Sequence, residues 1–354
     1  MMQYYHIKKE FKTAWQKKIL KWYSKNKRNL PWRQKKNQHF YNIWISEIML
    51  QQTTVKTVIP YYNKFIEKWP NLETFFEASL DEILLIWQGM GYYQRAKNLY
   101  LAKEILKNEK IKFNLEDLKK LPGIGDYVSS AICAILFDQN CTVIDSNIKK
   151  IITRAFNLNK NKPNLEKNIK DIATELTPLR DNGSYCQALM DMANLICTNK
   201  TPNCLACPVK NECKYEGNIE LKGEKKIVKK KIGITYYIKF KDSVLLQRSG
   251  DRMLENLYCF PTTKFIDNNN ELDEKKLLKQ IGNNWQKINS ITYKHVFNKF
   301  IKHTFSHFHL KLFIIEIKLN RKKEFANYEW VLTEDIVNKP SSVLMKKIQG
   351  EVFC

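Results

Sequence analysis

A carboxylate in apolar surroundings is the first residue of this sequence that could do chemistry. Glu47 lies in SEIMLQQTTV, residues 46–55, which reads as one helix with almost no charge in a chain rich in lysine. On a helical wheel it shares a narrow stripe with Gln51 and Thr54, and apolar residues cover most of the rest. A helix that is apolar nearly all round is buried, and a buried glutamate needs a partner or a function. We expect this environment to raise the pKa of Glu47.

A second carboxylate, Asp145, lies in VIDSNIKKIITRAF, where a helix is expected to begin. The simplest interpretation is an N-cap, whose side chain accepts hydrogen bonds from backbone amides. Those amides should also keep the carboxylate ionised. Two carboxylates with opposed environments are what an acid and a charge stabiliser need. The sequence does not give their separation.

The segment LPGIG, residues 121–125, stands between two helical patterns. Its glycines, Gly123 and Gly125, favour a tight turn with outward-pointing amides, and a helix expected from near Tyr127 adds its N-terminal amides. Together these amides suit one phosphate. A plain turn between two helices is the alternative.

Four of the nine cysteines are clustered with the spacing C-x6-C-x2-C-x5-C, namely Cys197, Cys204, Cys207 and Cys213. Four thiolates this close in sequence can surround one metal centre. The spacing lacks the paired rhythm of zinc ribbons, and iron–sulfur clusters also take four cysteines in varied spacings. Zinc, iron–sulfur and four unrelated thiols all remain open from the residues alone.

The composition restricts the class of protein. The chain has 354 residues, 44% of them hydrophobic, which allows two domains with real cores. The formal net charge of +24 permits a polyanionic partner. However, only eight arginines accompany 52 lysines, which indicates that drift toward A/T-rich codons supplies about half of this charge. No membrane span, signal peptide or disulfide framework is evident, so we expect a cytoplasmic protein.

The elements that position these residues fall into two groups. From Phe11 to about Tyr215 apolar residues recur at helical spacing. Residues 219–232 are charged and read as a basic linker. After them, short β-type runs such as ITYYIKF and FHLKLFIIEIKL appear. We therefore predict a mainly α domain over 1–218, a linker over 219–232, and a smaller α+β domain over 233–354.

Several motifs, in this order along the chain, resemble the helix-hairpin-helix DNA glycosylases, and within them the MutY family: SEIMLQQT, WQGMGYYQRAKNL, LPGIGDYVSSAI, VIDSNIKKI, QALMD and the cysteine tail. The later run HTFSHFHL is similar to the damage-recognition domain of the same family. The resemblance implies a helix-hairpin-helix domain with an iron–sulfur loop over 197–213 and a Nudix-like C-terminal domain. No Nudix pyrophosphatase motif is found.

This resemblance also implies an activity in base excision repair. The enzyme would flip adenine, mispaired with 8-oxoguanine or guanine, out of duplex DNA and hydrolyse its N-glycosidic bond. It would act as a monomer, near the bacterial nucleoid when bound to DNA. The metal centre would be one [4Fe–4S] cluster with a structural role.

The family's catalytic roles carry over to four residues. Glu47 resembles the general acid, and Asp145 resembles the aspartate that stabilises the sugar cation. Asn147 matches an asparagine beside that aspartate, although Ser146 stands where the family usually has glycine. Tyr127 occupies the place where related bifunctional enzymes have a Schiff-base lysine, so no lyase activity of that type is expected.

Other positions match contacts with DNA. Gln52 resembles a glutamine that wedges into the duplex, and Tyr92, with Met90 nearby, resembles the residue inserted beside the oxidised guanine. The adenine-pocket matches are Arg28, Trp32, Leu50, Val55 and Gln187, and the 8-oxoguanine matches are Phe305, Ser306 and His307. Ordinary core packing is the alternative for the apolar ones. Four histidines between His295 and His309 raise a weaker zinc hypothesis.

Two rival functions remain at this point. One is a bifunctional endonuclease III-like glycosylase acting on oxidised pyrimidines, which Tyr127, the QQT stretch and the C-terminal domain oppose. The other is a non-catalytic iron–sulfur protein that binds nucleic acid. That protein would not need a carboxylate inside an apolar helix.

Overall fold

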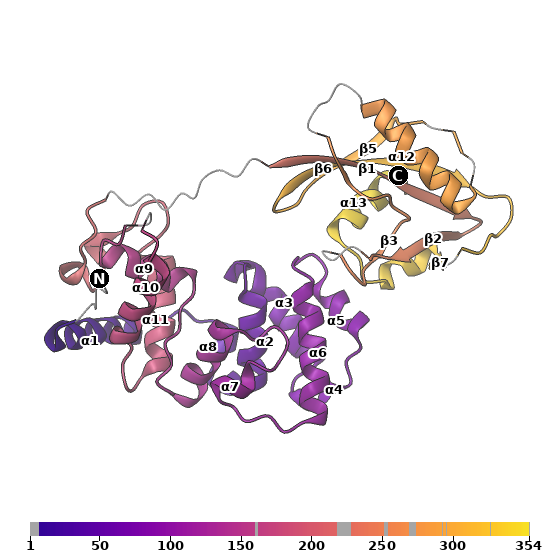
Figure 1. Cartoon of the computed structure of the whole chain (residues 1–354). Helices are drawn as coiled ribbons and strands as arrows, with labels where there is room; N and C mark the ends of the chain where they lie inside the picture. The colour runs from indigo at the N-terminus through magenta and orange to yellow at the C-terminus, as the bar shows by residue number, and fades with distance from the viewer. Residues whose placement is uncertain are drawn as a thin grey trace. The chain divides into compact units, whose positions relative to one another are not determined.

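The computed structural model describes residues 7–159, 162–217, 228–250, 254–268, 274–291, 293–294, 296–325 and 327–353. The chain divides into two compact units. The first combines Met1–Glu77 with Leu101–Gly223, and the second combines Ala78–Tyr100 with Glu224–Cys354. Figure 1 traces both. The predicted class, a helical part followed by a smaller α+β part, is confirmed.

Helices build the first unit. They are α1 (Lys9–Asn26), α2 (Phe40–Leu50), α3 (Val55–Lys68), α4 (Leu72–Phe76), the end of α6 (Gln94–Asn108), α7 (Leu115–Leu118), α8 (Asp126–Phe137), α9 (Ser146–Ala155), α10 (Leu165–Leu176) and α11 (Asn182–Leu195). One apolar core joins α1 with α8–α11. At its centre the buried indole of Trp15 donates to the hydroxyl of Tyr185 at 2.9 Å. This bond satisfies a donor that would otherwise be costly to bury.

The prediction of one helix over 46–55 is wrong. Helix α2 ends at Leu50 and α3 begins at Val55. Gln52 has a left-handed φ of 55°, which a continuing helix cannot contain. Thr54 caps α3 by accepting from the amide of Thr57 at 3.4 Å, because short hydroxyl side chains favour caps over helix interiors. Gln51 and Thr54 therefore do not share a helical stripe with Glu47.

The hairpin between α7 and α8 contains the LPGIG segment. The amide of Ile124 donates to the carbonyl of Leu121 at 3.1 Å, and Gly123 adopts a φ of 83° that favours glycine. Helix α8 begins at Asp126, one residue before the expected start. A Cβ added at Gly125, the residue before the helix, would meet no atom within 4 Å, so this backbone is open to an approaching ligand.

The second unit contains one mixed sheet. In the described residues its main path is β3–β2–β1–β6–β5, with β4 beside β1 and β7 beside β2. The strands are β1 (Lys229–Phe240), β2 (Ser243–Arg248), β3 (Tyr258–Cys259), β4 (Ile266–Asp267), β5 (Lys299–Thr304), β6 (Phe308–Lys318) and β7 (Tyr328–Leu332). Strands β1 and β6 run parallel, from Lys229 opposite Phe308 to Lys239 opposite Lys318.

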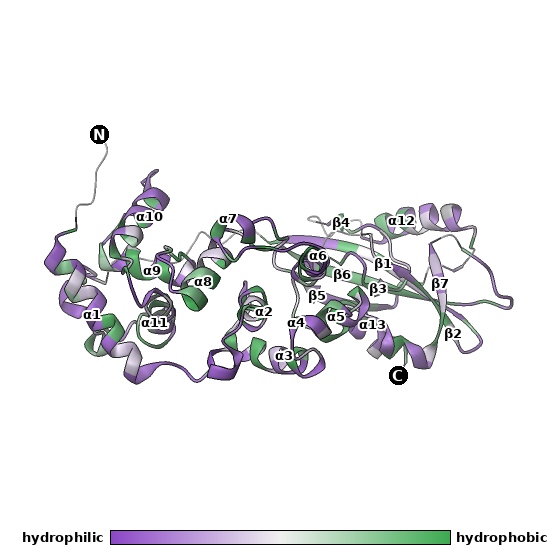
Figure 2. Cartoon of the chain, turned by 90° about the horizontal axis from the view of Figure 1, so that it is seen from below, coloured by the Kyte–Doolittle hydropathy of each residue, from purple (hydrophilic) through white to green (hydrophobic). Residues whose placement is uncertain are grey.

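Both faces of this sheet are covered, which explains the long buried run of β1. Helix α12 (Glu274–Asn289) packs on one face through Leu278 and Trp285. Helix α13 (Val343–Val352) covers the other through Leu344, Met345 and Ile348. Figure 1 shows the two helices on opposite sides. Figure 2 shows hydrophobic and hydrophilic residues alternating along α12, as expected for a helix with one face on a sheet.

The predicted linker, 219–232, is too long at its C-terminal end. Residues 219–227 lie outside the described residues, and strand β1 already begins at Lys229. The lysines of this stretch do not prevent pairing, because Lys229 and Lys230 are exposed while Ile232 is buried between neighbouring strands. The second unit also includes 78–100, which holds α5 (Leu80–Trp87) and the start of α6. None of the described helices is long and apolar enough to cross a lipid bilayer.

Candidate active site

Glu47 lies on α2 and is buried, with only 4% of its surface exposed. The hydroxyl of Tyr127, on α8, donates to its Oε2 at 2.6 Å. Burial raises the pKa of Glu47 to about 7, and the negative field of Asp145 adds to this, while the Tyr127 hydrogen bond and Arg33 oppose it. Burial likewise raises the pKa of Tyr127 far above its usual range, so the phenol remains a donor. Glu47 therefore has a pKa near neutral pH, which suits a group that gives and takes a proton during catalysis.

Asp145 forms the N-cap of α9, as expected. Its Oδ1 accepts from the amide of Ile148 at 2.7 Å, and its Oδ2 accepts from the side-chain amide of Asn147 at 2.8 Å. The expected direction of its pKa is wrong: burial raises the pKa of Asp145, and the hydrogen bonds from Ile148 and Asn147 only oppose that rise. The N-cap amides therefore offset desolvation in part. Ser146 begins α9 without a left-handed φ, so nothing here demands glycine.

A buried ion cluster that the sequence analysis missed lies near Glu47. Asp191, on α11, is fully buried and binds two arginines, with Arg28 Nε at 2.6 Å and Arg33 Nη1 at 2.7 Å. Arg33 in turn lowers the pKa of Glu47. The signal was available, because Asp191 ends the motif QALMD inside a largely apolar helix, as Glu47 does in α2. A carboxylate in an apolar helix needs a partner or a function, and this argument holds for Asp191 as it does for Glu47.

The predicted adenine-pocket residues have different surroundings. Arg28 joins the Asp191 cluster. Trp32 is buried and packs its ring edge-on against Tyr62 at 5.3 Å. Leu50 and Val55 are half-buried on the two sides of the α2–α3 turn. Gln187 donates to the carbonyl of Gly183 in its own helix at 3.0 Å.

The predicted DNA wedge, Gln52, lies exposed at the tip of the α2–α3 turn. Its neighbour Gln51 donates to the carbonyl of Gly123 at 3.4 Å. The turn is therefore tied to the α7–α8 hairpin, so the structure brings the wedge and the candidate phosphate site together.

In the second unit, Tyr92 is the exposed residue of a tight turn between α5 and α6. It is 45% exposed and has a left-handed φ of 50°, whereas Met90 is buried. The indole of Trp87 and the guanidinium of Arg95 both donate to the carbonyl of Gly91 at 3.1 Å. These bonds hold the turn, and they present the phenol ring to solvent.

The four clustered cysteines line one pocket of about 220 Å³, together with Arg154 and Tyr215. Arg154 Nη1 donates to the sulfur of Cys197 at 3.2 Å. Burial raises the pKa of the Cys207 thiol to about 11 and also raises that of Cys213, so the thiolate form needs a compensating charge. Among the described residues, no set of three or more such side chains is arranged to hold a single metal ion.

The turn of the β5–β6 hairpin contains Phe305, Ser306 and His307. The amide of Phe305 donates to the carbonyl of Phe308 at 2.9 Å, which leaves Ser306 and His307 exposed at the tip. Phe305 packs on His303, with ring centroids 4.6 Å apart. His307 also borders a pocket of about 730 Å³. Burial lowers the pKa of His303, and no described group of histidines could hold a metal ion; His295 lies outside the described residues.

Comparison with known proteins decides the family. Residues 45–178 match the HhH-GPD superfamily of base excision DNA repair proteins, and residues 235–350 match the NUDIX domain. The adenine DNA glycosylase of Buchnera aphidicola subsp. Schizaphis graminum is 37% identical over 95% of this chain and 97% of its own length. The chain belongs to the adenine DNA glycosylase family. The human adenine DNA glycosylase is 34% identical over 59% of this chain and 40% of its own length.

A solved structure supports the fold of this adenine DNA glycosylase. The structure of a thermostable thymine-DNA glycosylase matches 58% of the chain at 27% identity, with a TM-score of 0.51. The match covers 96% of that structure. Family membership makes the protein a DNA N-glycosylase, so the non-catalytic rival is set aside.

Proposed function

We propose that this adenine DNA glycosylase removes adenine mispaired with 8-oxoguanine or guanine in duplex DNA. Relatives that match most of the chain are named adenine DNA glycosylase. The observation that carries the proposal is the buried Glu47, which accepts the Tyr127 hydroxyl and lies in the field of Asp145. Such a pair of carboxylates suits cleavage of a glycosidic bond.

Glu47 acts as the general acid in this proposal. Adenine is flipped out of the stack into the site, because the glycosidic bond cannot be reached inside the duplex. With a pKa of about 7, Glu47 carries its proton in a large share of molecules at neutral pH. It passes that proton to the five-membered ring of adenine, which makes the base a better leaving group.

Asp145 stabilises the cation that departure of adenine leaves on the sugar. Asn147 and the amide of Ile148 fix both oxygens of its carboxylate, so the group does not reorganise as charge develops. Glu47, now ionised, activates a water molecule that attacks the sugar. This hydrolyses the N-glycosidic bond without a Schiff-base intermediate on an amine of the enzyme.

Tyr127 makes the enzyme monofunctional in this proposal. Its hydroxyl is engaged with Glu47, and a phenol forms no Schiff base. The alternative, an endonuclease III-like glycosylase and lyase on oxidised pyrimidines, needs an amine at this position.

The DNA contacts follow the exposed turns of the two units. Gly123 and Gly125 offer backbone amides to a phosphate, and Gln52 enters the duplex from the turn beside them. Tyr92 stacks beside the oxidised guanine. The tip formed by Phe305, Ser306 and His307 reads that base. We assign these roles to a monomer with a helical part and a C-terminal α+β part, which acts in the cytoplasm on nucleoid DNA.

Cys197, Cys204, Cys207 and Cys213 would hold one [4Fe–4S] cluster, which when bound fixes the surrounding loop. Their shared pocket and the cation of Arg154 fit such an anionic group. Substitution Cys204→Ser should abolish the iron content of the purified protein and its cluster absorbance. The matched variant Cys259→Ser, outside this pocket, should retain both; equal iron in the two variants would contradict the assignment.

A single-turnover assay tests the activity. One duplex carries adenine opposite 8-oxoguanine, another carries an oxidised pyrimidine, and each product is examined with and without alkali. We expect strand cleavage at adenine only after alkali. A nick without alkali, chiefly at the oxidised pyrimidine, would support the lyase alternative.

A further inference from the structure

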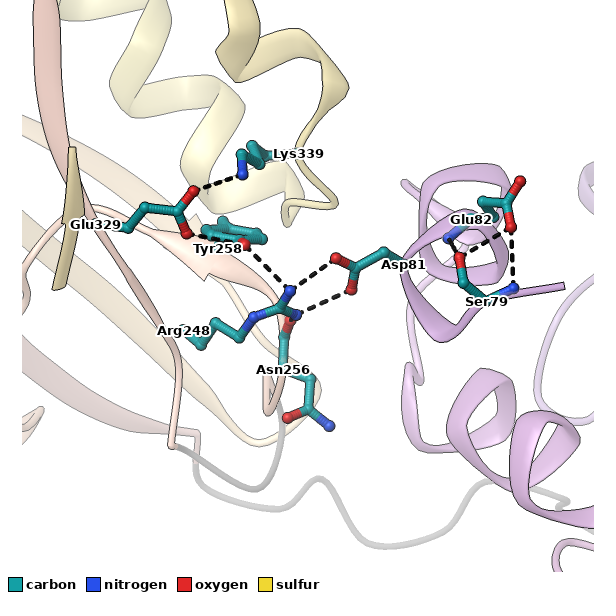
Figure 3. A network of polar contacts seen from close by, with 8 residues as sticks. All are labelled: Ser79, Asp81, Glu82, Arg248, Asn256, Tyr258, Glu329 and Lys339. Atoms are coloured by element: carbon teal, nitrogen blue, oxygen red, sulfur yellow. Dashed lines mark hydrogen bonds and ion pairs between the residues drawn. The ribbon is translucent and has the colours of Figure 1, made fainter. Parts of the chain in front are cut away.

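Polar contacts join the segment 78–100, which carries Tyr92, to the C-terminal residues of the second unit. The guanidinium of Arg248 binds the carboxylate of Asp81 through two bonds, at 2.9 and 2.7 Å. Lys97 Nζ lies 2.5 Å from Glu255 Oε2, and Gln88 Nε2 donates to Ser341 Oγ at 2.5 Å. Figure 3 shows the first of these contacts.

Arg248 is itself held in place on the strand side. Nη1 donates to the carbonyl of Asn256 at 3.0 Å, and Nη2 donates to the hydroxyl of Tyr258 at 3.1 Å. The guanidinium lies 4.4 Å from the centre of the Tyr258 ring. Tyr258 in turn donates to Glu329, which also binds Lys339 at 2.7 Å (Figure 3). The chain has 52 lysines, yet position 248 is an arginine. Only the planar guanidinium, with its several donors, can make all these contacts at once.

The helix side of the contact is equally ordered. Ser79 and Glu82 form a capping box around the first turn of α5, with Ser79 Oγ accepting from the amide of Glu82 at 3.3 Å and Glu82 accepting from the amide of Ser79 at 2.9 Å (Figure 3). Asp81 therefore projects from a fixed turn. At the far end of α5, the bonds to the carbonyl of Gly91 hold the turn that carries Tyr92. Trp87, the last residue of α5, is thus bonded directly to the turn that carries Tyr92.

We propose that Arg248 and Asp81 are positioning residues for Tyr92. The C-terminal domain, through this pair and the Lys97–Glu255 pair, sets where the Tyr92 ring enters DNA. The two pairs have opposite polarity, with the acid on α5 in one and on the C-terminal side in the other. A shift that exchanged partners would place like charges together, so the pattern fixes one register. This inference rests on the proposed reading of 8-oxoguanine by the C-terminal domain.

The consequence is a coupling between lesion recognition and adenine removal. When the hairpin tip at Phe305–His307 binds 8-oxoguanine, the same domain holds Tyr92 in place to insert beside that base. When guanine replaces 8-oxoguanine, the C-terminal domain gains little binding energy, and the position of Tyr92 has less effect on adenine removal. Loss of the pair should therefore lower activity on the oxidised mispair more than activity on the plain one.

The experiment uses the full chain and compares single-turnover adenine release from A:8-oxoguanine and A:G duplexes. The variants are Asp81→Asn, Arg248→Gln and the double variant. The matched control is Glu316→Gln, which breaks the similarly exposed Lys299–Glu316 pair in the same sheet. Each single variant should lower the ratio of the two rates about three- to fivefold, because half-exposed pairs are individually weak. The double variant should lose no more than either single one.

A second readout follows Tyr92 itself. A 2-aminopurine next to the 8-oxoguanine reports the unstacking that insertion of the ring causes, and it needs no catalysis. We expect its fluorescence rise on binding to shrink in Asp81→Asn and Arg248→Gln, and to stay intact in Glu316→Gln. Unchanged rate ratios and fluorescence in both single variants would overturn the coupling. Wild-type protein that releases no adenine at all would instead overturn the proposed function, while the fluorescence comparison would still test the coupling.

Discussion

Two carboxylates in different parts of the molecule bind their partners in opposite environments, one buried and one exposed to solvent. Glu47 is 4% exposed and accepts one phenol hydroxyl, whereas the side chain of Asp81 is 40% exposed and binds a full guanidinium. Burial removes the water that would stabilise the charge of Glu47, and its pKa rises to about 7. The carboxylate of Asp81 stays accessible to solvent. The site with fewer partners is therefore the one suited to proton transfer, and the better-paired one is suited to holding structure.

The largest expected effect is on the buried carboxylate. Substitution Glu47→Gln removes the transferable proton while keeping the shape and an acceptor for Tyr127. We expect adenine release to fall by at least ~100-fold, the usual contribution of a general acid. Single-turnover kinetics measure this, with duplex affinity as the control for folding. A loss below tenfold with intact binding would mean that another group supplies the proton.

The same burial should appear as a pH-dependent stability. The folded pKa of Glu47, about 7, lies above its usual 4.5, so the folded state binds the proton more tightly. The resulting stabilisation is present below pH 4.5 and is lost as pH rises through about 7. The full difference corresponds to about 3 kcal/mol.

Urea unfolding of wild type and Glu47→Gln across this range measures it. The variant should gain stability relative to wild type between pH 4.5 and 7.5. A difference between the two proteins that stays constant with pH would show that Glu47 is not desolvated.

A smaller effect is expected from the phenol. The Tyr127 hydrogen bond lowers the pKa of Glu47 against the effect of burial. Substitution Tyr127→Phe should therefore raise that pKa and move the alkaline fall in rate to higher pH. The control is Tyr41→Phe, which removes a buried hydroxyl on the same helix that donates to the carbonyl of Trp69 at 2.8 Å. Its pH profile should match that of wild type; a shift in both variants would contradict a specific bond.

The smallest effect is expected at the exposed pair. A double-mutant cycle of Asp81→Asn and Arg248→Gln on unfolding free energy should give a coupling below about 1 kcal/mol. Added salt should reduce it, because exposed charges are screened. The pH response of Glu47→Gln should persist in the same salt. A coupling energy that is large and independent of salt would show that the Asp81–Arg248 pair is not screened by solvent, which would remove the contrast with Glu47.

Local pattern predicted much of the fold. Helical spacing up to about Tyr215 and β-type runs after it gave the two-part architecture, because hydrophobic periodicity is a local property. The N-cap at Asp145 and the buried Glu47 were also visible. The break at Gln52 was missed, since a single left-handed residue leaves the apolar pattern of its neighbours intact. The start of β1 at Lys229 was missed because its pairing partners lie far along the chain.

The sequence by itself determined which groups are available for chemistry: a carboxylate in an apolar helix, a capped aspartate, a hairpin of glycines and four clustered thiols. The tertiary structure alone decided that Tyr127 meets Glu47, that Arg33 and Arg28 share Asp191, and that burial outweighs the N-cap amides in raising the pKa of Asp145. The physical reason is that desolvation and long-range contacts depend on which segments pack together. Spacing along the chain fixes only neighbours within a helix, strand or turn.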